Sequence, residues 1–248
     1  MMSSLISTSF TASAFDTATG FGNCDINLHG LPIERVTNFT YLGSDISDKV
    51  TVASADINAR IGKANFAFSK LNKCLWRRNE ITMKTKMRIF NAIVIPTLIY
   101  GAECWTLLAQ DAKKLEVFQM SCLRRILNVR LQDRLKNEEI RKRCENQDIV
   151  GNKIKSARLR WFGHVCRMEA SRLPRKLLQE NRPGHWKCPR SAPKKQWKDQ
   201  VIADLRPLHF NSIDDITEAA LNRAQWRGLR RDICEAATSG SGSLPYRR

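Results

Sequence analysis

Basic and aromatic residues that could bind phosphate groups and stack on bases are interleaved between residues 151 and 200. This stretch holds fourteen Lys and Arg against three Asp and Glu, a net charge of +11, together with three tryptophans and two histidines. Guanidinium and ammonium groups bind phosphate oxygens, and aromatic rings stack on bases. A solvated protein surface or a ribosomal-type binder could have a similar composition, but the interleaved rings favour nucleic-acid binding.

The helix expected at about residues 150–169 carries most of the candidate contacts. Its helical periodicity places a set of apolar residues on one face, namely Ile154, Ala157, Trp161, Val165 and Met168. The candidate nucleic-acid-binding residues of this helix are Lys153, Arg158, Arg160, His164 and Arg167. We expect His164 to pack beside Trp161 and to donate a hydrogen bond to a backbone carbonyl or a phosphate.

Cysteine and histidine residues in the same part of the chain raise the question of a zinc site. The candidate ligands are Cys144, His164, Cys166, His185 and Cys188. Structural zinc sites usually contain a tight Cys-x-x-Cys pair, which this set lacks, and two residues that are two positions apart on a helix point about 200° away from each other. We therefore predict no bound metal. A Cys–His nucleophile is also disfavoured, because no orienting group stands at a recognisable spacing.

The composition describes a basic globular protein. The chain of 248 residues has 42 Lys and Arg against 24 Asp and Glu, a net charge of +18 and a pI of about 10.0, which attracts polyanions. It lacks the roughly 18–20 consecutive apolar residues of a membrane span and a clear signal peptide. Its eight scattered cysteines suit reduced thiols in a protein core. These features favour the cytoplasm or nucleus over secretion.

The elements that must position these residues are mainly α-helical. We expect a short N-terminal β-hairpin, then a three-helix bundle, then a basic helical C-terminal region. The bundle helices are expected from Ala53 to Leu75, from Thr82 to Val94 and from Asp111 to Ile126, with Ser54 and Thr82 as N-caps and an end or a kink at Pro96. Later helices are expected near residues 135–146, 150–169, 195–204 and 213–235. The predicted regions are a disordered leader (1–23), the hairpin (24–50), the bundle (51–128), a basic helical region (129–180), a basic loop with terminal helices (181–236) and a disordered tail (237–248).

Several short segments, taken in order, are similar to those of a known family. They are Val36-x-x-Phe39-x-Tyr41-Leu42-Gly43-Ser44, Ile57-x-x-Arg60-Ile61-x-x-Ala64, Lys84-x-Lys86, Pro96-x-Leu98-x-Tyr100-Gly101-x-Glu103-x-Trp105, Cys122-Leu123-Arg124-Arg125-Ile126-Leu127, Arg158-Leu159-Arg160-Trp161-Phe162-Gly163-His164-Val165-x-Arg167-Met168, Pro193-Lys194-Lys195-x-Trp197-x-Asp199 and Trp226-Arg227. Together they resemble the C-terminal part of the endonuclease–reverse transcriptase of non-LTR (LINE-type) retrotransposons, over about residues 26–233.

The resemblance implies roles for two parts of the chain. The segment containing Tyr41 and Gly43 resembles the primer grip, the hairpin that supports the primer strand, although both residues could equally be core and turn positions. The bundle resembles the thumb, which holds the primer–template duplex, and there Lys63, Lys70 and Arg77 would contact backbone phosphates. A solvated helix face would also explain these three basic residues.

The resemblance also implies what the chain lacks. Reverse transcriptases hold magnesium ions with aspartates of the palm, and we expect no palm or fingers upstream of residue 26. The only Asp-Asp pair, Asp214-Asp215, follows Ser212 and is interpreted as the cap and first turn of a helix. The chain is therefore expected to be a truncated fragment that binds RNA and DNA backbones, with no cofactor and no polymerase activity of its own. The alternatives are a host-adopted helical adaptor that binds proteins, or an enzyme active only within a longer polyprotein that supplies palm and fingers.

Overall fold

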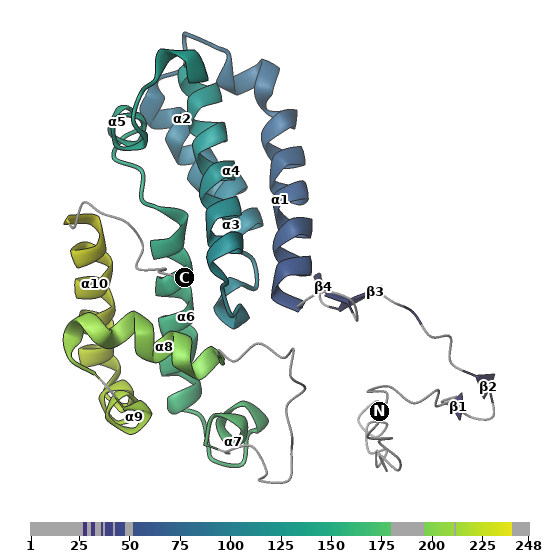
Figure 1. Cartoon of the computed structure of the whole chain (residues 1–248), viewed down its shortest axis with the longest axis vertical. Coiled ribbons are helices and arrows are strands. Elements are labelled where there is room, and N and C mark those ends of the chain that lie inside the picture. The colour runs from purple at the N-terminus through teal and green to yellow at the C-terminus, as the bar shows by residue number, and fades with distance from the viewer. Residues whose placement is uncertain are drawn as a thin grey trace, which may run out of the picture. The chain divides into compact units, whose positions relative to one another are not determined.

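The structure is a computed structural model that describes residues 27–28, 31–32, 36, 38–41, 43–47, 52–179, 196–210 and 212–239. The chain divides into two compact units, Met1–Thr37 and Asn38–Arg248. The described residues are mainly α-helical, as predicted (Figure 1). None of their helices combines the length and apolar character that a membrane span requires. The predicted leader at 1–23, the basic loop at 181–195 and residues 240–248 of the predicted tail lie outside the described residues.

The strands form two separate antiparallel pairs. In the first unit β1 (Asn27–Leu28) pairs with β2 (Leu31–Pro32). In the second unit β3 (Asn38–Tyr41) pairs with β4 (Ser44–Ser47). The single hairpin predicted over residues 24–50 is therefore not supported. Gly43, with a φ of +83°, makes a tight turn that pairs β3 with the residues after it instead of with those before it.

The bundle is built from three helical segments, two of which contain π-helical turns. Helix α1 (Val52–Lys70) leads through the π turn η1 (Asn72–Trp76) to α2 (Met83–Ile89). Helix α2 continues without a break through the π turn η2 (Phe90–Val94) into α3 (Ile95–Leu98). The 3-10 turn η3 (Ala102–Cys104) then precedes α4 (Ala109–Leu127).

Of the two N-caps predicted in the bundle, one is confirmed, and the helix also continues past Pro96. Thr82 caps α2, because its hydroxyl accepts a hydrogen bond from the Thr85 amide at 3.3 Å, as predicted. Ser54 is not a cap, because it lies inside α1 and donates to Asp111 Oδ2 at 2.5 Å. Pro96 does not end its helix: the wider π turn precedes it, and the Thr97 hydroxyl donates to the Ile93 carbonyl at 2.8 Å.

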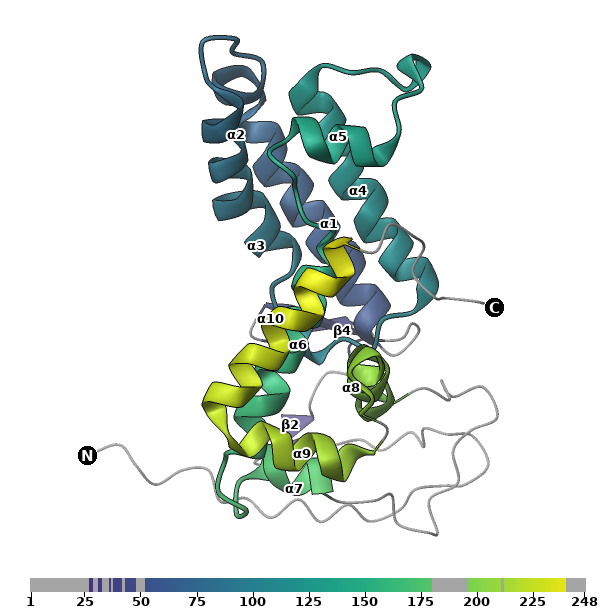
Figure 2. The same ribbon diagram turned by 90° about the vertical axis from the view of Figure 1, so that its left-hand side faces the viewer.

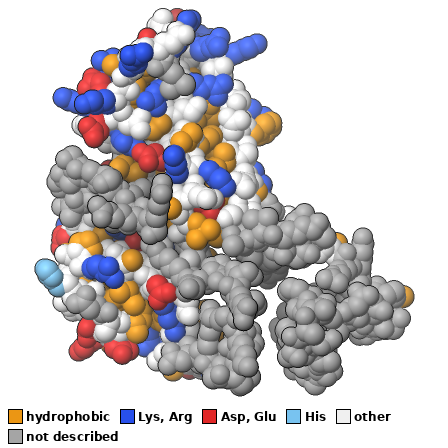
Figure 3. Space-filling model, viewed as in Figure 1, with side chains coloured by type: hydrophobic (Ala, Val, Ile, Leu, Met, Phe, Trp, Pro, Cys, Tyr) orange, Lys and Arg blue, Asp and Glu red, His pale blue; other side chains and the backbone are white. Residues whose placement is uncertain are grey.

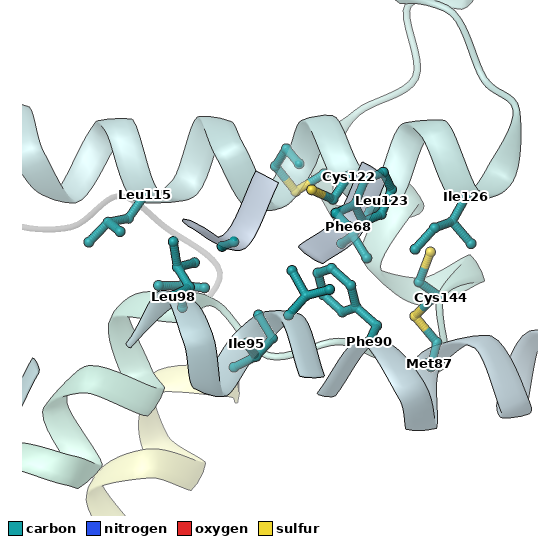
Figure 4. Packing of buried hydrophobic residues seen from close by; sticks show 14 of the residues in the cluster. Phe68, Met87, Phe90, Ile95, Leu98, Leu115, Cys122, Leu123, Ile126 and Cys144 are labelled. Carbon is teal, nitrogen blue, oxygen red and sulfur yellow. The ribbon is translucent and has the colours of Figure 1, made fainter. Parts of the chain in front are cut away.

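The bundle core consists of apolar side chains from α1, α2, α3 and α4 that point toward one another (Figure 4). Phe68 lies at its centre, stacked on Trp76 at 5.1 Å and edge-on to Phe90 at 6.5 Å. Cys122 and Cys144 are buried in the same cluster as free thiols. The prediction of core-filling cysteines is confirmed for these two and for buried Cys166, whereas Cys74 and Cys104 are exposed.

The C-terminal half folds around one long helix. After η4 (Leu131–Asp133) and α5 (Asn137–Arg143) comes α6 (Val150–Cys166), which packs on α4 and η3. The elements that follow are α7 (Leu173–Gln179), α8 (Trp197–Leu205), η5 (Arg206–Leu208), α9 (Ile213–Leu221) and α10 (Arg223–Ser239). A second hydrophobic cluster joins α6 to α8, α9 and α10.

The last helices differ from the sequence prediction in three places. Helix α7 was not predicted. The single helix expected over 213–235 is two helices, because Asn222 Oδ1 accepts from the amides of Ala224 and Gln225 and so caps α10. Helix α10 also extends to Ser239, into the predicted tail. Ser212 caps α9 by accepting from the Asp215 amide at 3.1 Å, so the interpretation of the Asp-Asp pair as a first-turn feature is confirmed.

Candidate nucleic-acid interface

A groove of about 610 Å³ lies between α6 and α10, which pack side by side (Figures 1 and 2). Five arginines line it: Arg160 of α6, Arg167 directly after α6, and Arg223, Arg227 and Arg230 of α10. The remaining lining residues are Glu103, Ala157, Trp161, His164 and Trp226. A groove of this size with five guanidinium groups is suited to a ligand with several negative charges.

The groove exists because Trp226 anchors α10 on α6. Its indole is buried, and its Nε1–H donates to the Leu159 carbonyl at 2.9 Å. The ring centroid lies 5.8 Å from that of Phe162. Gly163 provides the space, since a Cβ atom there would lie 2.2 Å from Trp226 Nε1. The resemblance segments Trp-Phe-Gly-His and Trp-Arg therefore meet in one contact.

The predicted apolar face of α6 has to be corrected. The helix buries Val150, Ile154, Arg158, Leu159, Phe162, Gly163, Val165 and Cys166. By contrast, Ala157, Trp161 and Met168 are only half-buried. The helix packs against α4 and η3 on one side and against α8, α9 and α10 on another, so its buried surface is wider than a single stripe. Ala157 and Trp161 are consequently left to line the groove.

Arg158 was predicted to bind nucleic acid, and that prediction is wrong. Its side chain is 1% exposed and forms a buried ion pair with Asp204 of α8. A cation that is buried and paired inside the fold cannot reach a phosphate in solution. Arg158 is a structural residue that links α6 to α8.

The other predicted residues of α6 lie where a ligand could reach them. Arg160, His164 and Arg167 are exposed and line the groove. The rings of His164 and Trp161 are 5.6 Å apart and tilted by 50°, so the predicted packing of these two rings is confirmed. Arg167 donates to the Ala220 carbonyl at 2.5 Å, which holds its guanidinium near α9. Lys153 is half-buried on α6 and does not line the groove.

The predicted primer-grip segment is attached to the bundle by a buried polar network. Arg60 of α1 donates to the Gly43 carbonyl at 2.5 Å, and its guanidinium lies 4.4 Å from the centroid of the Tyr100 ring. Arg60 also pairs with Asp56 at 3.5 Å, and Asp56 Oδ2 accepts from Trp105 Nε1 at 2.9 Å. Sequence reasoning named Gly43 as a contact but missed the side chains that hold it.

This network joins the three resemblance segments that contain Gly43, Arg60 and Trp105. The other residues predicted to bind nucleic acid in this part of the chain lie near the Gly43 turn or farther along the bundle. Lys63 is exposed near the turn, with Nζ 3.5 Å from the Gly43 carbonyl. Tyr41 belongs to β3, and its side chain lies outside the described part. Lys70 and Arg77 are exposed at the far end of α1 and just after η1. Lys and Arg side chains gather at that end of the bundle in Figure 3.

The described residues offer neither a metal site nor an activated thiol. Among them no three His, Cys, Asp or Glu side chains are close enough to hold a metal ion. His185 and Cys188 lie outside the described residues. Burial raises the pKa of the Cys166 thiol, despite opposing effects of Thr217 and Arg175, so this thiol is protonated near neutral pH and is a poor nucleophile.

Sequence reasoning missed half of the groove. Arg223, Arg227 and Arg230 recur every three or four residues on α10, and this spacing alone indicates one basic helix face. Glu103 comes from η3, and its backbone carbonyl accepts from Trp197 Nε1 at 2.8 Å. Nothing in the sequence placed that carboxylate beside the arginines, because 57 residues separate Glu103 from Arg160.

Comparison with known proteins finds a relative among transposon-derived proteins. The chain is 28% identical, over 206 residues, to an uncharacterized transposon-derived protein of Caenorhabditis elegans. The match covers 80% of this chain and 72% of that protein. No family model and no solved structure matches the chain. The chain is thus similar, over most of its length, to a protein of transposon origin.

Proposed function

We propose that this chain is a transposon-derived protein that binds nucleic acid through the groove between α6 and α10. The observation that carries the proposal is the convergence of five arginines from two helices on a groove that also holds the Trp161–His164 ring pair. Guanidinium groups make charge-assisted, often paired hydrogen bonds to phosphate oxygens. Aromatic rings beside them provide stacking surfaces for bases.

The finer form of the proposal is that the chain corresponds to the primer grip and thumb of a non-LTR retrotransposon reverse transcriptase. Its support is that the segments carrying the resemblance make the contacts that join distant parts of the fold. Arg60 holds the Gly43 turn, Trp197 bonds to the Glu103 carbonyl, and Trp226 fits against Gly163. Residues whose identity is set by such contacts are the ones that a shared fold would retain.

In this view Gly43, Lys63, Lys70 and Arg77 would contact RNA or DNA backbones along the bundle. Polymerisation would belong to the palm and fingers of a parent enzyme, which would supply the magnesium ligands and act as the partner of this chain. The chain alone would bind nucleic acid without extending a primer. A primer-extension reaction with magnesium tests this part, and incorporation of deoxynucleotides by the purified chain would refute it.

The groove itself can be tested by fluorescence anisotropy with labelled RNA and DNA at several salt concentrations. Arg160→Ala and Arg227→Ala should each weaken binding and lower the salt dependence by about one phosphate contact. Lys155→Ala is the matched control, because it removes a positive charge from α6 about 140° around the helix from Arg160. The proposal fails if Lys155→Ala weakens binding as much as Arg160→Ala does.

A further inference from the structure

We infer that the groove takes a single-stranded segment and holds one unpaired base that carries an amino group. This inference rests on the proposed function and specifies its ligand. The first argument is width. The axes of two packed helices lie roughly 8–10 Å apart, so the groove between them is a narrow furrow bounded by side chains. A duplex is wider than such a furrow, since its major groove alone is about 12 Å wide. A duplex can touch the rim of a groove between α6 and α10, but only a single strand can enter it.

The second argument is the aromatic pair inside the groove. Trp161 is half-buried and His164 is exposed, and their planes are tilted by 50° with centroids 5.6 Å apart. Rings tilted in this way do not cover each other's faces, so a flat base can stack on the indole. Stacking of this kind needs a base that has left the helical stack, as in single strands.

The third argument is the carboxylate of Glu103. Glu103 lines a groove with five guanidinium groups, yet among the described residues no cation forms an ion pair with its carboxylate. A carboxylate repels phosphate, so the phosphate groups must lie toward the arginines and another part of the ligand toward Glu103. Carboxylates accept hydrogen bonds from the amino groups of bases, as from N4 of cytosine.

The position of Glu103 is fixed by its neighbours. Its backbone carbonyl accepts from Trp197 Nε1 at 2.8 Å, and η3 packs directly on α6. The carboxylate therefore approaches the groove from a different element than the arginines of α10. Cytosine, adenine and guanine each present an amino group to such an acceptor, whereas uracil and thymine do not.

Fluorescence anisotropy with oligo(C) and oligo(U) RNA of equal length, and with a duplex of the same length, tests the inference on the full chain. The wild-type protein should bind oligo(C) roughly 3- to 10-fold more tightly than oligo(U), the scale of one hydrogen bond to a charged acceptor. Glu103→Gln should raise the affinity for oligo(U) and reduce the preference to less than about 2-fold, because an amide both accepts and donates. Glu218→Gln, which removes an exposed carboxylate of α9, is the control for net charge and should keep the preference.

The outcomes separate this inference from the proposed function. If Arg160→Ala weakens binding but oligo(C) and oligo(U) bind equally, the groove binds nucleic acid and the inference is overturned. It is also overturned if the duplex binds more tightly than both single strands and Arg160→Ala weakens that binding. If Arg160→Ala has no effect on any of the three ligands, the proposed function itself fails.

Discussion

Replacing Gly163 by alanine tests how α10 is held against α6. A Cβ atom at this position would lie 2.2 Å from Trp226 Nε1 and 2.5 Å from Trp226 Cδ1. The Trp226 indole cannot shift easily, because it is 2% exposed, donates a hydrogen bond to the Leu159 carbonyl at 2.9 Å and packs against Phe162. The indole must move, and α10 must move with it.

The expected loss of stability follows from three contributions. Overpacking a buried contact costs about 1–3 kcal/mol. Breaking or straining the hydrogen bond from Trp226 to Leu159 costs about 1 kcal/mol more. The higher helix propensity of alanine offsets about 1 kcal/mol. The free energy of unfolding should therefore fall by about 1–3 kcal/mol, which urea denaturation followed by tryptophan fluorescence can measure.

Gly62→Ala is the matched control. Gly62 lies inside α1, and a Cβ atom there would have nothing within 4 Å, so this substitution should stabilise the protein by about 0.5–1 kcal/mol. Trp226→Phe should partly relieve the loss of stability that Gly163→Ala causes, and a double-mutant cycle should give a coupling energy of about 0.5 kcal/mol or more. If Gly163→Ala is as stabilising as Gly62→Ala, Trp226 does not occupy the position described, and α10 is not held against α6 to form the groove.

Three further predictions concern buried polar groups. Arg158→Met should lower the free energy of unfolding by about 3–5 kcal/mol, because it leaves the buried Asp204 carboxylate without its partner. Adding Asp204→Leu should restore much of that loss. Denaturation curves that show no recovery in the double variant would contradict this. Trp105→Phe should cost about 1–3 kcal/mol in the same assay by removing the donor to a buried carboxylate, and a neutral effect would argue against that bond. Burial raises the pKa of Cys122 to about 12 and of Cys144 to about 11, from the ordinary value of about 9. The stability that these two protonated thiols contribute is full below pH 9 and is lost as the pH rises from 9 through 11 and 12, so the unfolding free energy should fall less over that range in a double Cys-to-Ala variant.

The helices of the bundle could be predicted because their apolar residues repeat with helical spacing and face a single core. In the stripe of α1, Ile57, Ala64 and Phe68 are fully buried and Ile61 is partly buried, as its period predicts. Helix α6 shows where this reasoning fails. Neighbouring helices bury it on more than one side, so a single apolar stripe does not describe its buried surface. Arg158 is buried because Asp204 of α8 pairs with it. The sequence contains no local sign of that partner.

The sequence predicted the chemistry of the candidate site, but only some of the residues that form it. Local charge density indicated α6, and Arg160, His164 and Arg167 do line the groove. The arginines of α10 lie about 60 residues further along the chain, and the packing of Trp226 against Gly163, Leu159 and Phe162 brings the two rows together. Charge counts over a window cannot detect a surface that two distant segments form jointly. The strand pairing was missed for a related reason, since a single turn at Gly43 decides which segments pair.

Because the groove forms only when α10 docks on α6, folding of the second hydrophobic cluster and binding of a ligand are thermodynamically linked. A ligand that binds only the docked form stabilises it by RT ln(1 + [L]/Kd), about 2.7 kcal/mol at a hundredfold excess over Kd. Gly163→Ala removes no charge and lies beneath the groove instead of in its lining. It should nevertheless weaken nucleic-acid binding, and high ligand concentration should restore part of the lost stability. A variant that binds normally despite a destabilised cluster would show that the arginines act singly, as surface charges, and that their arrangement across two helices has no bearing on binding.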